Sequence, residues 1–440
     1  FVPNADGQNN DLFRNNGDGT FTDITGPPGS PSNDGGDARA AAWVDFDSDG
    51  YLDLFVVNAG SSDGYVTGEN DCLYRNNGDG TFTRTTAAQV GAIVTDADPG
   101  WACWWGDYDN DGLIDLLRFR YRPGIVLEPI LYRNGGSEGF SRVLVSSLTD
   151  AGANWGGWVD YDNDGWLDVF GCNLDAPYRL HRNLEGSAFV NAAATAGLDQ
   201  TAHHNYVGVW GDYDNDGFVD LLIAHSNEPN ALYQNQGDGT FALVAVGDDV
   251  PNGSDEMGIA WIDFDNDGFL DVFIANFWGA DGPLPNDLFR NNLPNTGNTN
   301  SWLKIKLTGS VSNRSGIGAR LRAAASLNGR PIQQMWTIGC GESARSGTSG
   351  LLAHFGLGDA TQVDTLRIEW PSGIVQELKD VPANQILTVT EPPRLIPQGI
   401  GAFQIQCWIN QSFDVEASTD LASWSNVATL TNTTGTLVFD

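Results

Sequence analysis

The chain of 440 residues carries 57 acidic against 22 basic side chains, and its formal net charge is −35. Such a surface repels nucleic acid, because nucleic-acid binding relies on Lys and Arg to neutralise phosphates. A hydrophobic content of 41% with 15 Trp indicates a packed core rather than disorder. No run approaches the roughly 20 apolar residues that a membrane-spanning helix needs. We therefore expect no nucleic-acid partner and no membrane span.

The first predicted element is a β-hairpin in the stretch DLFRNNGDGTF, which starts at Asp11. Asn-Gly and Asp-Gly pairs between apolar runs favour tight hairpin turns, because such turns need positive φ angles. Related stretches start at Cys72, Ile130, Arg179 and Ala231, and the shortened copy DLFRNN starts at Asp287. The hairpin is therefore one part of a repeat.

The second predicted element is an acidic nine-residue loop, DFDSDGYLD, which starts at Asp45. Four further copies start at Asp107, Asp160, Asp212 and Asp263, and each carries Asp at positions 1, 3, 5 and 9 and Gly at position 6. Ca²⁺ takes six to eight oxygens at about 2.3–2.6 Å, which alternating carboxylates can supply once glycine allows a sharp turn. The sequence thus predicts five Ca²⁺ sites.

In each loop the predicted ligands are the four carboxylates and the main-chain carbonyl of position 7. They are Asp45, Asp47, Asp49, Tyr51 and Asp53; Asp107, Asp109, Asp111, Leu113 and Asp115; Asp160, Asp162, Asp164, Trp166 and Asp168; Asp212, Asp214, Asp216, Phe218 and Asp220; and Asp263, Asp265, Asp267, Phe269 and Asp271. An EF-hand would need Glu at position 12, between two helices. Position 12 is instead Val56, Arg118, Gly171, Ile223 and Ile274.

The loops and hairpins together predict a unit of four strands that recurs about every 50 residues. Runs rich in β-branched and aromatic residues follow each loop, and a Trp stands two residues before it, so each loop joins two strands. The hairpin then supplies the third and fourth strands. Four antiparallel strands at this period describe a blade of a β-propeller, and the fold class is therefore all-β.

These repeats resemble the FG-GAP/VCBS repeats of integrin α-chain propellers and of secreted bacterial proteins, and the resemblance covers residues 1–301. Family propellers have seven blades, which implies that sequence upstream of this chain is missing. Because calcium is millimolar outside cells, the resemblance and the loops together imply an extracellular or cell-surface protein, with a bacterial source.

A different texture of short alternating strands begins at Trp302. The segments SNRSGIGA, HFGLG, WPSG and NQIL resemble the ASPIC/UnbV module of the cartilage acidic protein family, which implies a second β module at residues 302–391. Residues 392–440 read as a Pro-rich linker, expected to act as a hinge, and a truncated small β-sandwich module. Because blade five lacks a fourth strand, we expect the segment WLKIKL or a neighbour to cover its open edge and pack tightly on the propeller.

The Cys residues are five in number and form no CxxC motif, which disfavours a zinc or redox site. One or two disulfides and buried free thiols remain alternatives.

The face opposite the acidic loops is the predicted recognition surface. Chain direction puts the loops and the Gly-rich turns on one face, and the connections of variable length on the other, where binding proteins commonly recognise ligands. Aromatic and acidic side chains suit a glycan or protein ligand, although loop acids are often simply solvated. The candidates are Asp37, Asp98, Trp101, Trp155, His203, His204, Asp255, Glu256 and Trp278.

No catalytic residue is predicted, since the chain has no GxSxG, HExxH or GxxxxGK[ST] motif. The sequence favours a secreted, calcium-stabilised module for binding, adhesion or surface assembly. The alternative is a polysaccharide-active hydrolase or lyase, which needs two carboxylates about 5–9.5 Å apart in the central cleft or on the face opposite the loops.

Overall fold

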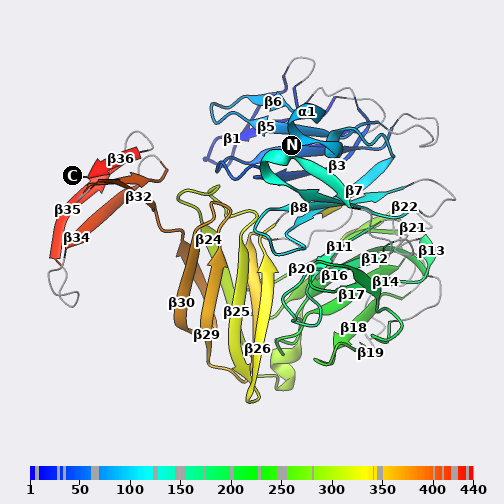
Figure 1. Ribbon diagram of the computed structural model, residues 1–440. Helices are drawn as coiled ribbons and strands as arrows, with labels where there is room; N and C mark the ends of the chain where they lie inside the picture. The colour runs from blue at the N-terminus through cyan, green and yellow to red at the C-terminus, as the bar shows by residue number, and fades with distance from the viewer. Residues whose placement is uncertain are drawn as a thin grey trace.

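The computed structural model is built almost wholly of β-strands (Figure 1). It describes residues 1–4, 9–26, 30–32, 36–60, 69–121, 127–143, 148, 155–172, 174–198, 203–225, 229–244, 255–279, 282–339, 341–343, 350–399, 402–408, 411–417, 425–432 and 436–439. Among these residues, no helix is long and apolar enough to cross a membrane. The all-β prediction is confirmed.

Antiparallel four-stranded sheets follow one another along the first part of the chain, after a hairpin of β1 (Phe13–Asn15) and β2 (Phe21–Asp23). The first two sheets are β3 (Ala38–Val44), β4 (Asp53–Asn58), β5 (Cys72–Asn76) and β6 (Phe82–Arg84), then β7 (Gly100–Gly106), β8 (Asp115–Arg120), β9 (Ile130–Asn134) and β10 (Phe140–Val143). The third is β11 (Trp155–Val159), β12 (Asp168–Cys172), β14 (Arg179–Asn183) and β15 (Phe189–Asn191). The fourth is β16 (His203–Gly211), β17 (Asp220–His225), β18 (Ala231–Asn235) and β19 (Phe241–Val244), with β13 (Leu174–Ala176) added beside β16.

The fifth sheet is shorter on its outer side, as the sequence predicts. It contains β20 (Asp255–Ile262) and β21 (Asp271–Gly279), and the short strands β22 (Gly282–Pro283) and β23 (Asp287–Phe289) both pair with β21. The helical pieces are single turns: α1 (Ala87–Val90), η1 (Ala92–Val94), η2 (Gly136–Glu138) and η4 (Leu293–Thr296).

Neighbouring sheets pack together through Trp residues that precede acidic loops. Trp105 meets Phe55 of the preceding sheet edge-on, with ring centroids 5.4 Å apart. Trp210 meets Phe170 in the same way, also at 5.4 Å. Such contacts stabilise beyond the area they bury. The first strands β3, β7, β11, β16 and β20 each contact the next, so they line the inner side of the blades.

The second module is a sandwich of two sheets, β28-β24-β31 and β26-β25-β29-β30, which share one apolar core. Leu303 and Phe355 enter this core from one sheet, and Leu321 and Leu366 enter it from the other. The strands are β24 (Ser301–Thr308), β25 (Arg320–Leu327), β26 (Arg330–Thr337), β28 (Leu352–Gly358), β29 (Gln362–Glu369), β30 (Val375–Pro382) and β31 (Gln385–Thr390). Every second residue of β25 is buried and most of the others are half-buried, so one face of this strand lies on the core.

One strand of this module leaves the sandwich. β27 (Gly341–Ser343) pairs antiparallel with β7 and becomes a fifth strand on the inner edge of the second blade. It also contacts β3 and β11. The predicted tight packing of module and propeller is therefore confirmed. The open edge of blade five is not covered by strand pairing, because WLKIKL lies in β24, which pairs with β28 and β31. The same segment does contact blade five, since its Lys304 pairs with Asp263 in the acidic loop of that blade.

The C-terminal segment forms two small sheets, drawn in red in Figure 1. They contain β32 (Arg394–Gly399), β33 (Ala402–Gln406) and β36 (Thr436–Phe439), and β34 (Ser412–Ala417) with β35 (Ser425–Thr431). The expected Pro-rich hinge is therefore largely a strand, because Arg394–Gly399 pairs with β33. Trp408 fastens the segment to the second module, since its main-chain N–H donates to Ser310 O and its Nε1 to Ser312 O, both at 2.8 Å.

Candidate metal loops and the face opposite them

Each acidic loop brings three carboxylates together. One oxygen from each of positions 1, 3 and 9 lies within 4.8 Å of the others, so each triad could hold a metal ion. Oxygens bound to one Ca²⁺ at 2.3–2.6 Å are at most about 5 Å apart, so this spacing fits a single cation. The triads are Asp45, Asp47 and Asp53; Asp107, Asp109 and Asp115; Asp160, Asp162 and Asp168; Asp212, Asp214 and Asp220; and Asp263, Asp265 and Asp271.

The main chain folds around the carboxylates at positions 1 and 9. In the first loop, Asp45 accepts the N–H groups of Asp49 and Gly50, each at 3.0 Å. Asp53 accepts N–H groups from Phe46 at 3.3 Å and from Asn76 of β5 at 2.8 Å. Gly50 has φ 91°, a conformation that side chains other than glycine resist. Hydrogen bonds from the loop and from β5 thus hold the carboxylates of the triad close together.

Position 5 stands outside the triads. Asp49 accepts the N–H of Tyr51 through Oδ1 at 2.9 Å, and its Oδ2 pairs with Arg75 at 2.9 Å. This carboxylate closes the turn, as Asp does in many tight turns. Metal ligation by position 5 and by the carbonyl of position 7 remains a prediction.

An Arg from the third strand of most blades lies against its own loop. Arg75 pairs with Asp47 at 2.6 Å, and Arg133, Arg182 and Arg290 make equivalent pairs in blades two, three and five. Blade four has Gln234 there, which donates to Asp214 at 2.7 Å. The fourth loop therefore lacks the charge that this position supplies elsewhere.

Burial and mutual repulsion oppose ionisation of these carboxyls when no metal is bound. Desolvation raises the pKa of Asp53 and of Asp160 to about 8 and that of Asp115 to about 9, and neighbouring loop carboxylates add to each shift. A divalent cation would remove this penalty, because it supplies the missing positive charge. The loops are therefore suited to cation binding.

Sequence reasoning missed the residue at position 4, which links neighbouring loops. Asn110 donates to Gly165 O at 3.2 Å, and Asn215 donates to Gly268 O at 3.1 Å. These Asn residues have φ near 56–59°, in the left-handed region that Asn tolerates better than most residues. The signal was present, since position 4 is Asn in all loops but the first, where it is Ser48.

A second link, also missed, comes from the Asn that follows the Arg of the third strand. Asn134 Nδ2 donates to Phe46 O of the preceding blade at 3.1 Å and to Ile114 O of its own blade at 3.1 Å. Asn183 and Asn235 repeat this arrangement one and two blades further on. The loops are thus joined into one hydrogen-bonded array.

The second module covers the loop face. Arg320 Nη1 donates to Asp107 Oδ2 at 2.8 Å, and Lys304 pairs with Asp263. At the fourth loop, His354 Nε2 donates to Asn215 Oδ1 at 2.8 Å. Each of these residues comes from a strand of the sandwich.

The remaining loops are also touched. A Cβ added at Gly50 in the first loop would lie 2.5 Å from Val311 O, so the module approaches that loop at its backbone. Arg322 Nη1 donates to Gly165 O in the third loop at 3.3 Å. The ring of Tyr51, in the first loop, lies 5.4 Å from that of Trp408. Every acidic loop therefore meets the chain beyond the propeller.

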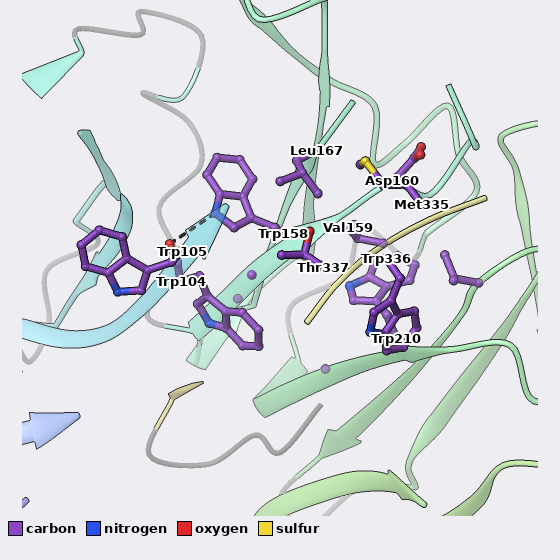
Figure 2. Close-up of a pocket in the computed structure, with 14 residues that line it drawn as sticks. Trp104, Trp105, Trp158, Val159, Asp160, Leu167, Trp210, Met335, Trp336 and Thr337 are labelled. Carbon is purple, nitrogen blue, oxygen red and sulfur yellow. Dashed lines mark hydrogen bonds between the residues drawn. The ribbon is translucent and has the colours of Figure 1, made fainter. Parts of the chain in front are cut away.

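A cavity of about 110 Å³ lies between the inner strands and β26. Figure 2 shows Trp158, Trp210 and Trp336 gathered around it, with Trp158 Nε1 donating to Trp104 O at 3.3 Å. Among the described residues that line it, Asp160 alone carries a carboxylate, and that group belongs to the third triad. The described lining therefore contains one carboxylate and not the pair that the hydrolase or lyase alternative needs.

On the opposite face, the structure brings several predicted residues together. Trp101 contacts Tyr121 in a tilted arrangement, with ring centroids 4.7 Å apart and the ring planes at 50°, and the Arg39 guanidinium lies 5.6 Å from the Trp101 ring. Asp98, whose side chain is 39% exposed, pairs with Arg120 at 2.9 Å. Asp37 is buried, pairs with Arg39 at 3.0 Å, and so is not a surface group.

The other predicted candidates lie at strand ends. Trp155, His203, His204, Asp255, Glu256 and Trp278 lie at the ends of β11, β16, β20 and β21, but their side chains are outside the described part of the structure. Of the cysteines, Cys72, Cys103, Cys172 and Cys407 are buried and no disulfide joins any two of them, and Cys340 lies outside the described residues.

Two protein families match the chain. The FG-GAP-like repeat family matches residues 1–56, 58–117, 160–223 and 212–274, which is more than half of the chain. The ASPIC and UnbV family matches residues 309–395. The Tc holotoxin pore of Photorhabdus luminescens aligns with TM-score 0.38 and 13% identity, over 93% of this chain and 19% of that chain. The biofilm matrix protein Bap1 of V. cholerae aligns with TM-score 0.34 and 12% identity, over 95% and 68%.

Two curated relatives share both parts. Cartilage acidic protein 1 of Mus musculus is 26% identical over 285 residues, which cover 60% of this chain and 41% of that protein. The Homo sapiens protein is 26% identical over 286 residues, which cover 60% and 40%. The chain thus spans about two fifths of the length of these relatives. It belongs to the FG-GAP-repeat proteins that also carry an ASPIC/UnbV domain, the architecture of cartilage acidic protein 1.

Proposed function

We propose that this chain is an extracellular binding module that calcium stabilises, and that it binds a glycan or protein ligand on the face opposite the acidic loops. One observation carries the proposal. The ASPIC/UnbV domain and the segment after it contact every acidic loop, as Arg320 does at Asp107 and Lys304 at Asp263. A covered loop face leaves the opposite face for recognition.

Calcium is the cation that best suits the loops. Their ligands are oxygens only, without His or Cys, which favours a hard cation over zinc. Ca²⁺ also accepts several carboxylates in irregular geometry, whereas Mg²⁺ demands a near-octahedral site and keeps waters. The metal serves stability and not chemistry in this proposal. The relatives' names place them in cartilage, and an extracellular setting would supply calcium at millimolar concentration.

The proposed recognition patch is centred on Trp101 and Tyr121, with Asp98 and Arg120 at its side. The two aromatic rings supply apolar area, and the ion pair supplies directional hydrogen bonds to hydroxyl or amide groups. Residues Trp155, His203, His204, Asp255, Glu256 and Trp278 are proposed to extend this patch across the neighbouring blades.

The test is ligand binding by the calcium-loaded chain on glycan and protein arrays, followed by titration of any hit. Trp101→Ala should weaken binding by about tenfold or more, since a buried aromatic anchor commonly contributes over 1.4 kcal/mol. Phe21→Ala is the matched control, because Phe21 is 64% exposed on the outer hairpin. Equal loss in both variants would contradict the patch, and release of reducing ends would favour the enzyme alternative.

A further inference from the structure

The positive charge beside the five loops is unequal. Each loop has four carboxylates, yet the number of Lys or Arg side chains paired with them differs from loop to loop among the described residues. The first and third loops each have one such cation, Arg75 and Arg182. The second and fifth loops have two, and the fourth has none among the residues described.

The carboxyl groups of the fourth loop have no paired Lys or Arg among the described residues. Asp212 is 2% exposed and Asp220 is fully buried. Gln234 replaces the Arg of the other blades and donates a neutral hydrogen bond to Asp214. His354 also stays neutral, because Asn215 Oδ1 can only accept and the buried His354 Nδ1 has no partner among the described residues.

The fifth loop is the opposite case. Arg290 pairs with Asp265 at 2.7 Å. Lys304, which is 4% exposed, reaches from β24 to pair with Asp263, and its ammonium lies 5.4 Å from the Trp302 ring. A buried ammonium at a position 1 carboxylate is poorly screened by solvent. The Lys304 ammonium therefore repels any cation that binds to the Asp263 carboxylate.

The second loop is intermediate. Arg133 pairs with Asp109 at 2.6 Å, and Arg320 pairs with Asp107 at 2.8 Å. Arg320 also pairs with Glu369 of its own domain at 2.5 Å. Since Glu369 neutralises part of the Arg320 charge, the second loop is less compensated than the fifth.

We propose that the ASPIC/UnbV domain sets the order of metal affinity among the loops, with Lys304 making the fifth loop the weakest site and the fourth loop the strongest. The inference rests on the proposed calcium binding. Lys304 and a cation at Asp263 repel one another, so metal in the fifth loop and docking of Lys304 disfavour each other. Loops one and three fall between these extremes, and loop two falls just above loop five.

The experiment titrates the calcium-loaded chain with a chelator and counts retained ions by native mass spectrometry. In the natural sequence the first ion should leave at a free calcium concentration well above that at which the last leaves. Lys304→Met should shift release of the fifth-loop ion to at least about tenfold lower free calcium, because it removes a unit charge next to the site. The ion of loop two then leaves first, so one ion instead of two should be lost in the early part of the titration. Gln234→Arg should shift release of the last ion to about tenfold higher free calcium for the converse reason.

Two matched variants locate the effect. Lys306→Met changes an exposed lysine on the same strand and should leave the free calcium concentration at which each ion is released unchanged. Asp263→Asn, which disables the fifth loop, should abolish the effect of Lys304→Met. If Lys304→Met does not fold without metal, Gln234→Arg still tests the order, since Gln234 is only partly buried.

The outcomes separate the two proposals. A natural chain that retains no calcium would overturn the proposed function itself. Calcium release that is the same in Lys304→Met, or in Gln234→Arg, as in the natural chain would overturn the affinity order alone. A weaker fifth site in Lys304→Met would show that Lys304 supports the loop and does not oppose its metal.

Discussion

The side-chain amide of Asn163 donates a 3.0 Å hydrogen bond to the carbonyl oxygen of Gly217, so the third acidic loop is fastened directly to the fourth. Asn163→Ala should therefore destabilise the protein by about 1 kcal/mol more than Asn266→Ala. Asn266 holds the same loop position with φ 58°, but its side chain has no hydrogen-bond partner among the described residues. Urea unfolding of both variants measures the difference in the free energy of unfolding. Equal losses of stability would mean that the hydrogen bond from Asn163 to Gly217 does not stabilise the protein.

Removal of metal should lower the melting temperature on the order of 10 °C, because each ion bound only to the folded state adds to its stability. Five triads that could hold a metal ion are available. Differential scanning calorimetry with excess chelator measures the effect, and the same chelator saturated beforehand with calcium is the control. An unchanged melting curve would contradict a stabilising role for metal.

The metal-free protein should lose stability as the pH rises from about 5 to about 8. Burial raises the pKa of Asp53 and Asp160 to about 8, whereas an unfolded Asp ionises near pH 4. Between these values the folded state keeps protons that the unfolded state has released, so the free energy of unfolding falls with rising pH. Melting of desalted, metal-free protein at both pH values tests this. Calcium-loaded protein should show a smaller fall, and an equal fall would contradict the assignment to the loops.

Glu391→Gln should destabilise the ASPIC/UnbV domain by about 2–4 kcal/mol. The buried Glu391 carboxylate accepts main-chain N–H groups from Ser310, Val311 and Ser312 at 2.7–2.8 Å and hydroxyl hydrogens from Ser312 and Ser372. An amide would turn a donor toward these donors. Glu377→Gln, at a side chain 44% exposed, is the control and should be nearly neutral. Similar losses in both would contradict this account.

Limited proteolysis should leave the propeller and the ASPIC/UnbV domain in one fragment. The connection near residues 298–300 is held, because Asn298 and Asn300 both donate to Asp214 O at 2.9 Å. The strand pair β7–β27 adds main-chain bonds between the two parts. Mass spectrometry of the first products checks this, and early cleavage at residues 294–301 into two stable pieces would argue against a single body.

The local parts of the fold could be predicted from the sequence because their causes are local. The spacing of Asp45, Asp47 and Asp53 and the turn at Gly50 are written in nine consecutive residues, and the structure gathers those carboxylates. Trp105 and Trp210 likewise pack between blades, as a strand residue next to each loop should. Repetition made each of these patterns visible several times over.

The contacts between distant parts could not be predicted. Arg320 and Lys304 meet carboxylates far away along the chain, and nothing in their own surroundings marks them out. The hydrogen bond from Asn110 to the neighbouring loop could not be predicted either, because its acceptor, Gly165 O, lies in the next repeat. The predicted hinge in the Pro-rich stretch was wrong for another reason. Arg394–Gly399 forms an edge strand of its sheet, and Pro is tolerated in edge strands.

The pairing of β27 with β7 has a consequence for biosynthesis. A ribosome releases the blades long before it reaches Gly341–Ser343, so the inner edge of the second blade waits without its last strand. Unpaired edges invite association with other chains, and contacts between distant segments form slowly. The inner edge of the second blade therefore stays unpaired until the C-terminal part of the chain has been made, and a chain terminated before Gly341 would carry an exposed edge that favours aggregation.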